Sequence, residues 1–172
     1  MKERILNVGC GSSDYGTDRI DVVKTPTTTK VANLNLGFPY KDEIFDEVYA
    51  NNVLEHIKNL DTFANECYRV LKKRGRLYIC TDNAAYIAWH VLKSHEHNAF
   101  YKNQHKNYPI RDDADDGHYH MFVPSNLKLL FKKFKNHKFS YKYGGRNRIV
   151  NNLIKLIPKK MGAISIVMEA EK

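Results

Sequence analysis

The sequence lacks any long hydrophobic run. No stretch of its 172 residues approaches the roughly 18 consecutive apolar residues that a membrane-spanning helix needs. Hydrophobic residues still make up 42% of the chain, enough to build the core of one domain of common size. The polar start, residues 1–4, leads directly into an expected strand, so we expect no signal peptide. We therefore expect a single cytoplasmic domain over residues 1–172, without a membrane partner.

Cysteine is scarce and scattered. Cys10, Cys67 and Cys80 lie far apart and form no CxxC pair. This spacing argues against a disulfide framework and a cysteine-based zinc site, and it favours a reducing compartment. A His118-x-His120 pair stands near four aspartates within residues 112–116, but acids in a polar loop are more often solvated than bound to a cation. We expect no metal site.

Acidic residues are nearly absent from the C-terminal third. After Met121, twelve lysines and arginines are opposed only by Glu169 and Glu171, and the whole chain carries a formal charge of +9. Such asymmetry is compatible with a nucleic-acid-binding or anionic-membrane-binding face. A solvated lysine-rich surface is the simpler interpretation, and we favour it because these lysines do not form one dense block.

Expected strands and helices alternate along the chain. The helical signal is clearest at 59–75, where Asn59 or Asp61 can cap the start and Gly75 can stop the helix. We expect strands at 4–8, 19–23, 45–50, 76–81, 138–143 and 163–171, and further helices at 84–94, 124–135 and 149–157. This order indicates an α/β fold with a mostly parallel central sheet flanked by helices.

A long polar stretch at 95–123 interrupts this alternation without convincing periodicity. A connection of that length inside a compact domain is usually functional or mobile. We expect it to form a lid or an acceptor-side loop.

The stretch ILNVGCGSSDYG, residues 5–16, runs from an expected strand into a glycine-rich loop. Glycine at Gly9 and Gly11 indicates either a plain tight turn or the close approach of another group to the backbone. In parallel sheets, ligands bind beyond the carboxyl ends of the strands, which is where this loop lies. A short glycine motif does not decide between the two interpretations.

Four stretches together resemble the class I S-adenosylmethionine-dependent methyltransferases, in particular a branch with short first loops and no N-terminal helical extension. They are LNVGCGSS, RIDV, FPYKDEIFDEVYANNVLEHI and ECYRVLKKRGRLYI, with a weaker fifth in HYHMFVPSNLKLLFKK, and they span residues 6–133. The resemblance implies a Rossmann-like methyltransferase fold, S-adenosylmethionine as the cofactor, and methyl transfer to a small-molecule acceptor.

The resemblance also implies roles for individual residues of the first loop. The backbone around Gly9, Cys10 and Gly11 would contact the methionyl part of the cofactor. Asp21, which follows the second strand, would accept hydrogen bonds from the ribose hydroxyls, since a carboxylate can accept two at once.

The resemblance implies further cofactor-binding positions outside the first loop. Asn33 and Leu34 match the place where the family often reads the adenine amino group, and Asn51 would line the reactive end of the cofactor. Asn7 is also placed in the cofactor site. At Asn7 and Asn33 many relatives carry an acid, and a neutral amide makes a weaker hydrogen bond than a charged group. Val53 and Leu54, which come shortly after Asn51, would pack the helix behind the pocket.

Methyl transfer from a sulfonium depends mainly on in-line positioning of the acceptor. A base is needed only where the acceptor must lose a proton. The catalytic candidates are His118 and His120 in the long loop, because histidine can act as a base near neutrality, and His56 in the LEHI stretch. The alternative for His56 is a histidine that only hydrogen-bonds the scaffold.

Two other functions stay open at this point. One is an RNA methyltransferase that uses the basic C-terminal third, and the other is a non-catalytic, methyltransferase-like binding protein. A nicotinamide-binding Rossmann domain is disfavoured, because no third glycine and no proper helix follow Gly11. The oligomeric state is not indicated.

Overall fold

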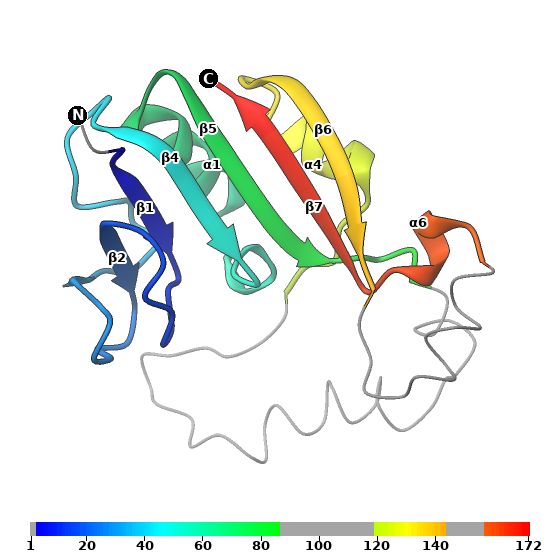
Figure 1. The fold of residues 1–172 in the computed structure, drawn as a ribbon, viewed down its shortest axis with the longest axis horizontal. Coiled ribbons are helices and arrows are strands. Elements are labelled where there is room, and N and C mark those ends of the chain that lie inside the picture. Colours follow the sequence, from blue (N-terminus) through cyan, green and yellow to red (C-terminus); the bar gives the residue numbers. More distant parts are fainter. Residues whose placement is uncertain (1–2, 87–118, 144–156) are drawn as a thin grey trace.

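The computed structural model describes residues 3–86, 119–143 and 157–172, and these residues contain one seven-stranded sheet (Figure 1). The strand order is β3-β2-β1-β4-β5-β7-β6. The first five strands in this order are parallel to one another, and β7 is antiparallel to both of its neighbours. The prediction of a mostly parallel α/β sheet is confirmed. The strands are β1 (Ile5–Val8), β2 (Asp18–Asp21), β3 (Lys30–Val31), β4 (Phe45–Asn51), β5 (Leu71–Asp82), β6 (Lys135–Lys142) and β7 (Ser165–Glu171).

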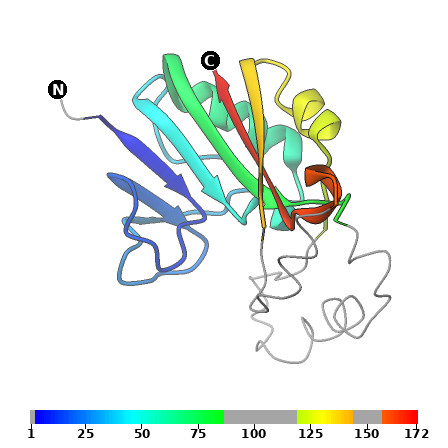
Figure 2. The same ribbon diagram turned by 45° about the vertical axis from the view of Figure 1, so that its right-hand side comes forward.

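The two longest described helices cover the same face of the sheet, behind it in Figure 1 (Figures 1 and 2). They bury Phe63 and Cys67 from one helix and Leu127 from the other in the core formed with the sheet. The Asn59 side chain caps the first of these helices by accepting a hydrogen bond from the Thr62 amide at 3.1 Å. The described helices are the 3-10 helix η1 (Leu54–His56), α1 (Leu60–Val70), α4 (Pro124–Leu130) and α6 (Lys159–Gly162). None of them is long and apolar enough to cross a membrane.

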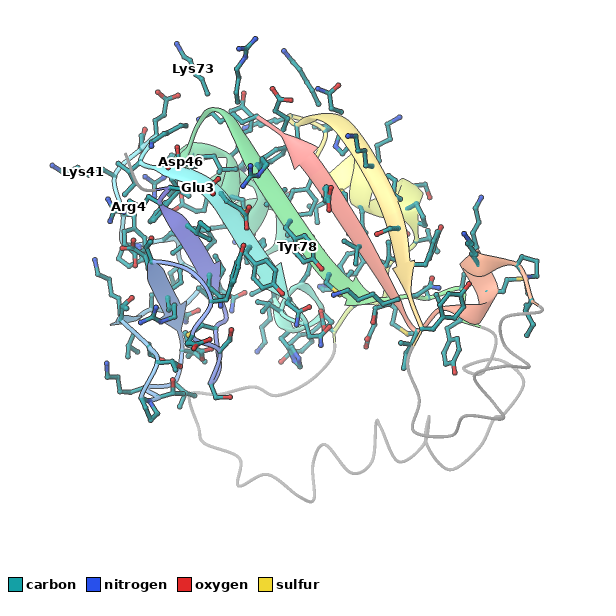
Figure 3. All side chains as sticks on the ribbon, viewed as in Figure 1. Glu3, Arg4, Lys41, Asp46, Lys73 and Tyr78 are labelled. Atoms are coloured by element: carbon teal, nitrogen blue, oxygen red, sulfur yellow. The ribbon has the colours of Figure 1, made fainter. Side chains whose placement is uncertain are left out.

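The opposite face of the sheet carries charged and aromatic side chains. Tyr49 and Tyr78 stack across β4 and β5, with ring centroids 4.7 Å apart and planes 14° from parallel. Figure 3 looks onto this face, with Tyr78 near its centre. We call it the polar face and define it by Glu47, Tyr49, Arg76, Tyr78, Lys138, Glu169 and Glu171.

Helix α1 is shorter than predicted, and the prediction that Gly75 stops it is wrong. The helix ends at Val70 because its last carbonyls, those of Arg69 and Val70, accept hydrogen bonds from the amides of residues 43 and 44. β5 then begins at Leu71, so its predicted start at 76 is also wrong. Gly75 instead lies in an irregularity of β5, where an added Cβ would come within 2.9 Å of the Lys72 carbonyl oxygen.

Other boundaries also differ from the predictions. The helix predicted over 124–135 ends at Leu130, since β6 already begins at Lys135. β3 was not predicted, because its two residues are both exposed and carry no alternation. Within the helix predicted at 84–94, residues 84–86 form a turn, in which the Tyr86 amide donates to the Asn83 carbonyl at 3.0 Å. Residues 87–118 and 144–156 lie outside the described residues, and with them most of the predicted loop at 95–123 and the helix predicted at 149–157.

Candidate functional site

The glycine loop leaves the carboxyl end of β1 and leads to the amino end of β2, and its first residues lie beside the carboxyl end of β2. The amides of Gly9 and Cys10 both donate to the Ile20 carbonyl, at 2.8 and 3.1 Å, which turns the chain sharply toward β2. Gly9 and Gly11 have φ angles of 64° and 52°, in the left-handed region that favours glycine. The loop therefore lies at the edge of the sheet where parallel α/β proteins bind ligands.

The two glycines have different surroundings. A Cβ added at Gly9 would lie 2.3 Å from Cγ2 of Val53, so close packing against Val53 already accounts for glycine at position 9. A Cβ added at Gly11 would meet nothing within 4 Å, so open space borders the backbone there. Of the two predicted close-approach positions, Gly11 is the one with room for a ligand.

Asp21 joins the glycine loop to the end of β2. Its Oδ2 accepts a hydrogen bond from the Gly11 amide at 2.8 Å, and its Oδ1 accepts one from the Val23 amide at 3.0 Å. A carboxylate has about four lone-pair positions on its two oxygens, so both oxygens can still accept another donor. Asp21 thus fixes the loop and retains acceptor capacity beside Gly11.

A threonine cluster holds the other side of Gly11. The hydroxyls of Thr25 and Thr27 donate to the Gly11 carbonyl at 2.7 and 3.0 Å, and buried Thr28 contacts Thr25 and the Cys10 sulfur. Sequence reasoning missed this cluster. The only signal for it was the run of hydroxyls in TPTTT, residues 25–29.

Asn7 and Cys10 are both buried beneath the loop. Nδ2 of Asn7 donates to the Tyr15 carbonyl at 3.2 Å and to Oγ of Ser13 at 3.4 Å. An ionised carboxylate has no proton to donate to that carbonyl, so the amide suits this loop where many relatives have an acid. Burial raises the pKa of the Cys10 thiol, which keeps it protonated and unreactive near neutrality.

Asn33 and Leu34 lie in the turn after β3, but they differ in exposure. Asn33 is exposed, and its Oδ1 accepts a hydrogen bond from the Asn35 amide at 3.0 Å, whereas Leu34 is buried in the core. Asn35, which sequence reasoning missed, connects the turn to the start of α1. Its Oδ1 accepts from the amides of Lys58 and Asn59, at 2.8 and 3.0 Å.

The end of β4 leads into η1 beside the glycine loop. Asn51 is half-buried as the last residue of β4, and His56 is half-buried as the last residue of η1. Val53, just before η1, is the residue that packs against Gly9. η1 therefore brings Asn51 and His56 to the same edge of the sheet as the glycine loop.

Glu55 anchors a second segment at this edge. The residue is 1% exposed, and its carboxylate accepts a hydrogen bond from the Thr81 hydroxyl at 2.8 Å. Its backbone carbonyl accepts the Tyr119 amide at 2.8 Å, and Phe122 pairs with Asn83 just beyond β5. Residues 119–122 thus run from η1 to the end of β5. Sequence reasoning did not identify Glu55 as a functional residue.

His120 lies within this segment, between Tyr119 and Phe122. Its ring centroid is 6.4 Å from that of Tyr119 and 6.0 Å from that of Phe122. Its Nε2 is buried, and in the part of the chain that the structure describes no group hydrogen-bonds to it. An orphaned buried nitrogen at the ligand edge is unusual and is compatible with a partner that arrives from outside the chain.

Two further predictions concern residues outside the described part. His118 lies outside it, as do the four aspartates within 112–116. Within the described residues, no group of three histidine, cysteine, aspartate or glutamate side chains is placed to hold a metal ion.

Comparison with known proteins connects this edge to a family. Residues 10–79 match the family described as Methyltransferase domain. The mitochondrial ubiquinone biosynthesis O-methyltransferase of Rattus norvegicus is 45% identical over 112 residues, which cover 50% of this chain and 32% of that enzyme. An uncharacterized protein of Methanocaldococcus jannaschii is 32% identical over 127 residues, which cover 66% of this chain and 53% of that protein. The chain therefore spans at most about half the length of these curated relatives.

A solved structure gives the same fold. A SAM-dependent methyltransferase from Thermotoga maritima matches 100% of this chain and 83% of its own, with a TM-score of 0.71 at 14% identity. The matched residues include Gly11, Asp21 and η1, which lie at the carboxyl edge. The chain thus has the fold of a SAM-dependent methyltransferase, and its residues 10–79 are similar to the Methyltransferase domain family.

Proposed function

We propose that this chain catalyses methyl transfer from S-adenosylmethionine to a small-molecule acceptor. The observation that carries the proposal is the open backbone at Gly11 beside the Asp21 carboxylate, at the carboxyl edge of the parallel strands. The match of residues 10–79 to the Methyltransferase domain family supports the same reaction, and the rat relative is named for an O-methylation in ubiquinone biosynthesis.

The residues present fit the cofactor. Open space beside the Gly11 backbone can admit a ligand, and Asp21 retains lone pairs that can accept hydrogen bonds from the ribose hydroxyls. We propose that the exposed Asn33 amide reads the adenine and that Asn51, the last residue of β4, lines the reactive end. Bound S-adenosylmethionine supplies a methyl group that its sulfonium has already activated.

Other predicted residues of the cofactor site act on the loop itself. Asn7 holds it through Tyr15 and Ser13, and the buried Cys10 fills the space beneath it. Gly9 allows the loop to pack against Val53, and Leu34 supports the neighbouring turn from the core. We propose that these four residues position the backbone and that Gly11 and Asp21 contact the cofactor.

On the acceptor side, we propose His120 as the base that takes the proton of a hydroxyl acceptor. Its buried Nε2 lies on a segment fixed to η1 and to the end of β5. His56, at the end of η1, is the alternative base, and His118 stays a prediction from the sequence. Enclosure of the acceptor by residues 119–122 would also exclude water from the methyl group.

Calorimetry and methyl transfer test this function. We expect S-adenosylmethionine and its demethylated product to bind with one site per chain, and tritium from the labelled methyl group to pass to simple catechols. Bulk RNA from the same assay should stay unlabelled. Absence of binding by both cofactor forms would favour a non-catalytic protein, and labelling of RNA alone would overturn the small-molecule acceptor.

Replacement of Asp21 by alanine should weaken cofactor binding about ten- to a hundredfold. The change removes the carboxylate that holds the Gly11 amide and that we assign to the ribose, and hydrogen bonds to charged groups are each worth about 1.5–3 kcal/mol. Calorimetry measures the dissociation constant. Asp14→Ala is the matched control, because Asp14 is an exposed acid of the same loop. An unchanged dissociation constant in Asp21→Ala would remove Asp21 from the site.

A further inference from the structure

We propose that Thr25 and Thr27 are positioning residues of the cofactor site. They hold the Gly11 backbone in the conformation that receives the amino-acid end of S-adenosylmethionine. The inference rests on the proposed function, in which Gly11 and Asp21 contact the cofactor. It adds two side chains that act on the cofactor through Gly11.

The place of Gly11 in the sheet assigns it to the amino-acid end. In the strand order β2-β1-β4, the loop after β1 lies between two residues that already have a role in the proposed site. Asp21 at the end of β2 is assigned to the ribose, and Asn51 at the end of β4 is assigned to the reactive end. The Gly11 backbone between them is therefore assigned to the amino-acid end.

Packing does not fix the backbone of Gly11. Its φ angle is 52°, and a Cβ added there would meet nothing within 4 Å among the described residues. Glycine also has the greatest backbone freedom of all residues. A glycine beside open space keeps one conformation only if hydrogen bonds restrain the two peptide groups that meet at its Cα.

Asp21 restrains the first of these peptide groups, which joins Cys10 to Gly11. The Gly11 amide donates to Oδ2 of Asp21 at 2.8 Å, and the Val23 amide donates to Oδ1 at 3.0 Å and so holds the carboxylate in turn. This hydrogen bond orients the peptide group before the Cα of Gly11. It does not restrain the peptide group after it.

Thr25 and Thr27 restrain the second peptide group, which joins Gly11 to Ser12. Their hydroxyls donate to the Gly11 carbonyl at 2.7 and 3.0 Å. A carbonyl oxygen has two lone pairs, so the two hydroxyls use its full capacity. Both peptide groups are then held by the chain itself. A site that is ordered in advance loses less conformational entropy when a ligand binds.

The two hydroxyls are themselves oriented by neighbours. Oγ1 of Thr25 lies 3.0 Å from Oγ1 of Thr27 and 2.8 Å from Oγ1 of Thr28, a residue that is only 3% exposed. The Arg19 side chain donates to the Thr27 carbonyl at 2.6 Å. The hydroxyls that hold Gly11 therefore belong to a network with contacts on several sides, as a positioning role requires.

Thr29 provides a matched control within the same run of hydroxyls. Its hydroxyl donates to the Arg19 carbonyl at 2.8 Å and accepts from the Arg19 amide at 2.8 Å. Thr29 thus connects the run to β2 through residue 19 and not through Gly11. The Thr29→Val variant removes a comparable hydroxyl and leaves the Gly11 carbonyl with both of its donors.

Calorimetry with two ligands tests the positioning role. S-adenosylmethionine has an amino-acid end, and 5′-methylthioadenosine has the same nucleoside without it. We expect Thr25→Val/Thr27→Val to raise the dissociation constant of S-adenosylmethionine about tenfold, the order of magnitude that fixing one residue's backbone is worth. The dissociation constant of 5′-methylthioadenosine should stay unchanged. Thr25→Ser/Thr27→Ser keeps both hydroxyls and should bind both ligands like the parent, as should Thr29→Val.

NMR of the protein without cofactor tests the cause. The Ser12 amide belongs to the same peptide group as the Gly11 carbonyl, so its order parameter reports the motion of that group. We expect about 0.85 in the parent and in Thr29→Val, and a fall toward about 0.6 in Thr25→Val/Thr27→Val. Circular dichroism checks folding. If the double variant does not fold, Thr27→Val alone should show smaller changes in the same directions.

Binding by the parent separates the positioning role from the proposed function. If the parent binds S-adenosylmethionine and Thr25→Val/Thr27→Val binds it equally well, the positioning role is wrong and the proposed function stands. Equal weakening of both ligands, or the same loss in Thr29→Val, would mean that the hydroxyls only maintain the loop, which also overturns the role. A parent that binds neither ligand overturns both.

Discussion

A His120→Gln variant is expected to bind S-adenosylmethionine as tightly as the parent and to transfer methyl about 100-fold more slowly to a hydroxyl acceptor. Glutamine keeps a polar, hydrogen-bonding end at this position but cannot take up a proton. The expectation rests on the buried, unpartnered Nε2 of His120 and on the fixed course of its segment. Calorimetry measures the affinity, and single-turnover methyl transfer measures the rate.

The pH dependence separates a base from a merely structural residue. As the pH rises and the acceptor hydroxyl ionises by itself, the deficit of His120→Gln should shrink, whereas a deficit caused by misplaced structure should persist. His137→Gln is the matched control. His137 lies on β6, outside the proposed site, and its Nε2 lies 3.1 Å from the Phe131 carbonyl. Full activity in His120→Gln together with a large loss in His56→Gln would transfer the role of base to His56.

Replacement of Gly9 by alanine is expected to lower the free energy of unfolding by about 2–4 kcal/mol. A non-glycine residue at a φ of 64° costs about 1 kcal/mol, and forcing an extra carbon into a packed contact costs about 1–3 kcal/mol. The new Cβ would lie 2.3 Å from Cγ2 of Val53, so that side chain or the loop must move. Urea denaturation measures the loss, which is a large part of a typical domain's stability.

Two further variants separate steric overlap from backbone strain. In Gly9→Ala/Val53→Ala, the side chain that the new carbon meets is truncated, so the double variant should lose less stability than the sum of the two single changes. Gly11→Ala carries similar backbone strain but meets nothing within 4 Å, so it should cost only about 1 kcal/mol. Equal destabilisation by Gly9→Ala and Gly11→Ala would contradict the packing explanation.

Local sequence patterns were sufficient for the central strands and for the existence of α1. β1, β4 and β7 were predicted within one or two residues, because apolar and β-forming residues cluster there between turn residues. The end of α1 was not predictable from its own sequence. Lys72, Lys73 and Gly75 look like a helix end, but Leu71 already pairs with Phe45, and that pairing depends on a segment 26 residues earlier.

The site could be predicted where a single residue type, glycine, indicates an unusual backbone conformation. It could not be predicted where side chains far apart in the sequence meet. Glycine at 9 and 11 indicated unusual backbone, and both positions have positive φ. The neighbour that makes Gly9 necessary, Val53, is 44 residues away, and no local pattern connects the two. The hydroxyls of Thr25 and Thr27 likewise become functional only once β2 brings them beside Gly11.

The short stretch around η1 contacts both the glycine loop and the 119–122 segment. Val53 packs against Gly9, and two residues later the Glu55 carbonyl receives the Tyr119 amide while its carboxylate receives the Thr81 hydroxyl. A rigid turn with a contact at each end is a means of thermodynamic linkage. If the cofactor stabilises the glycine loop and, through η1, the 119–122 segment, it raises the affinity for the acceptor. The bound acceptor must then raise the affinity for the cofactor by the same factor. Order of addition would then affect the rates of assembly and leave the stability of the ternary complex unchanged.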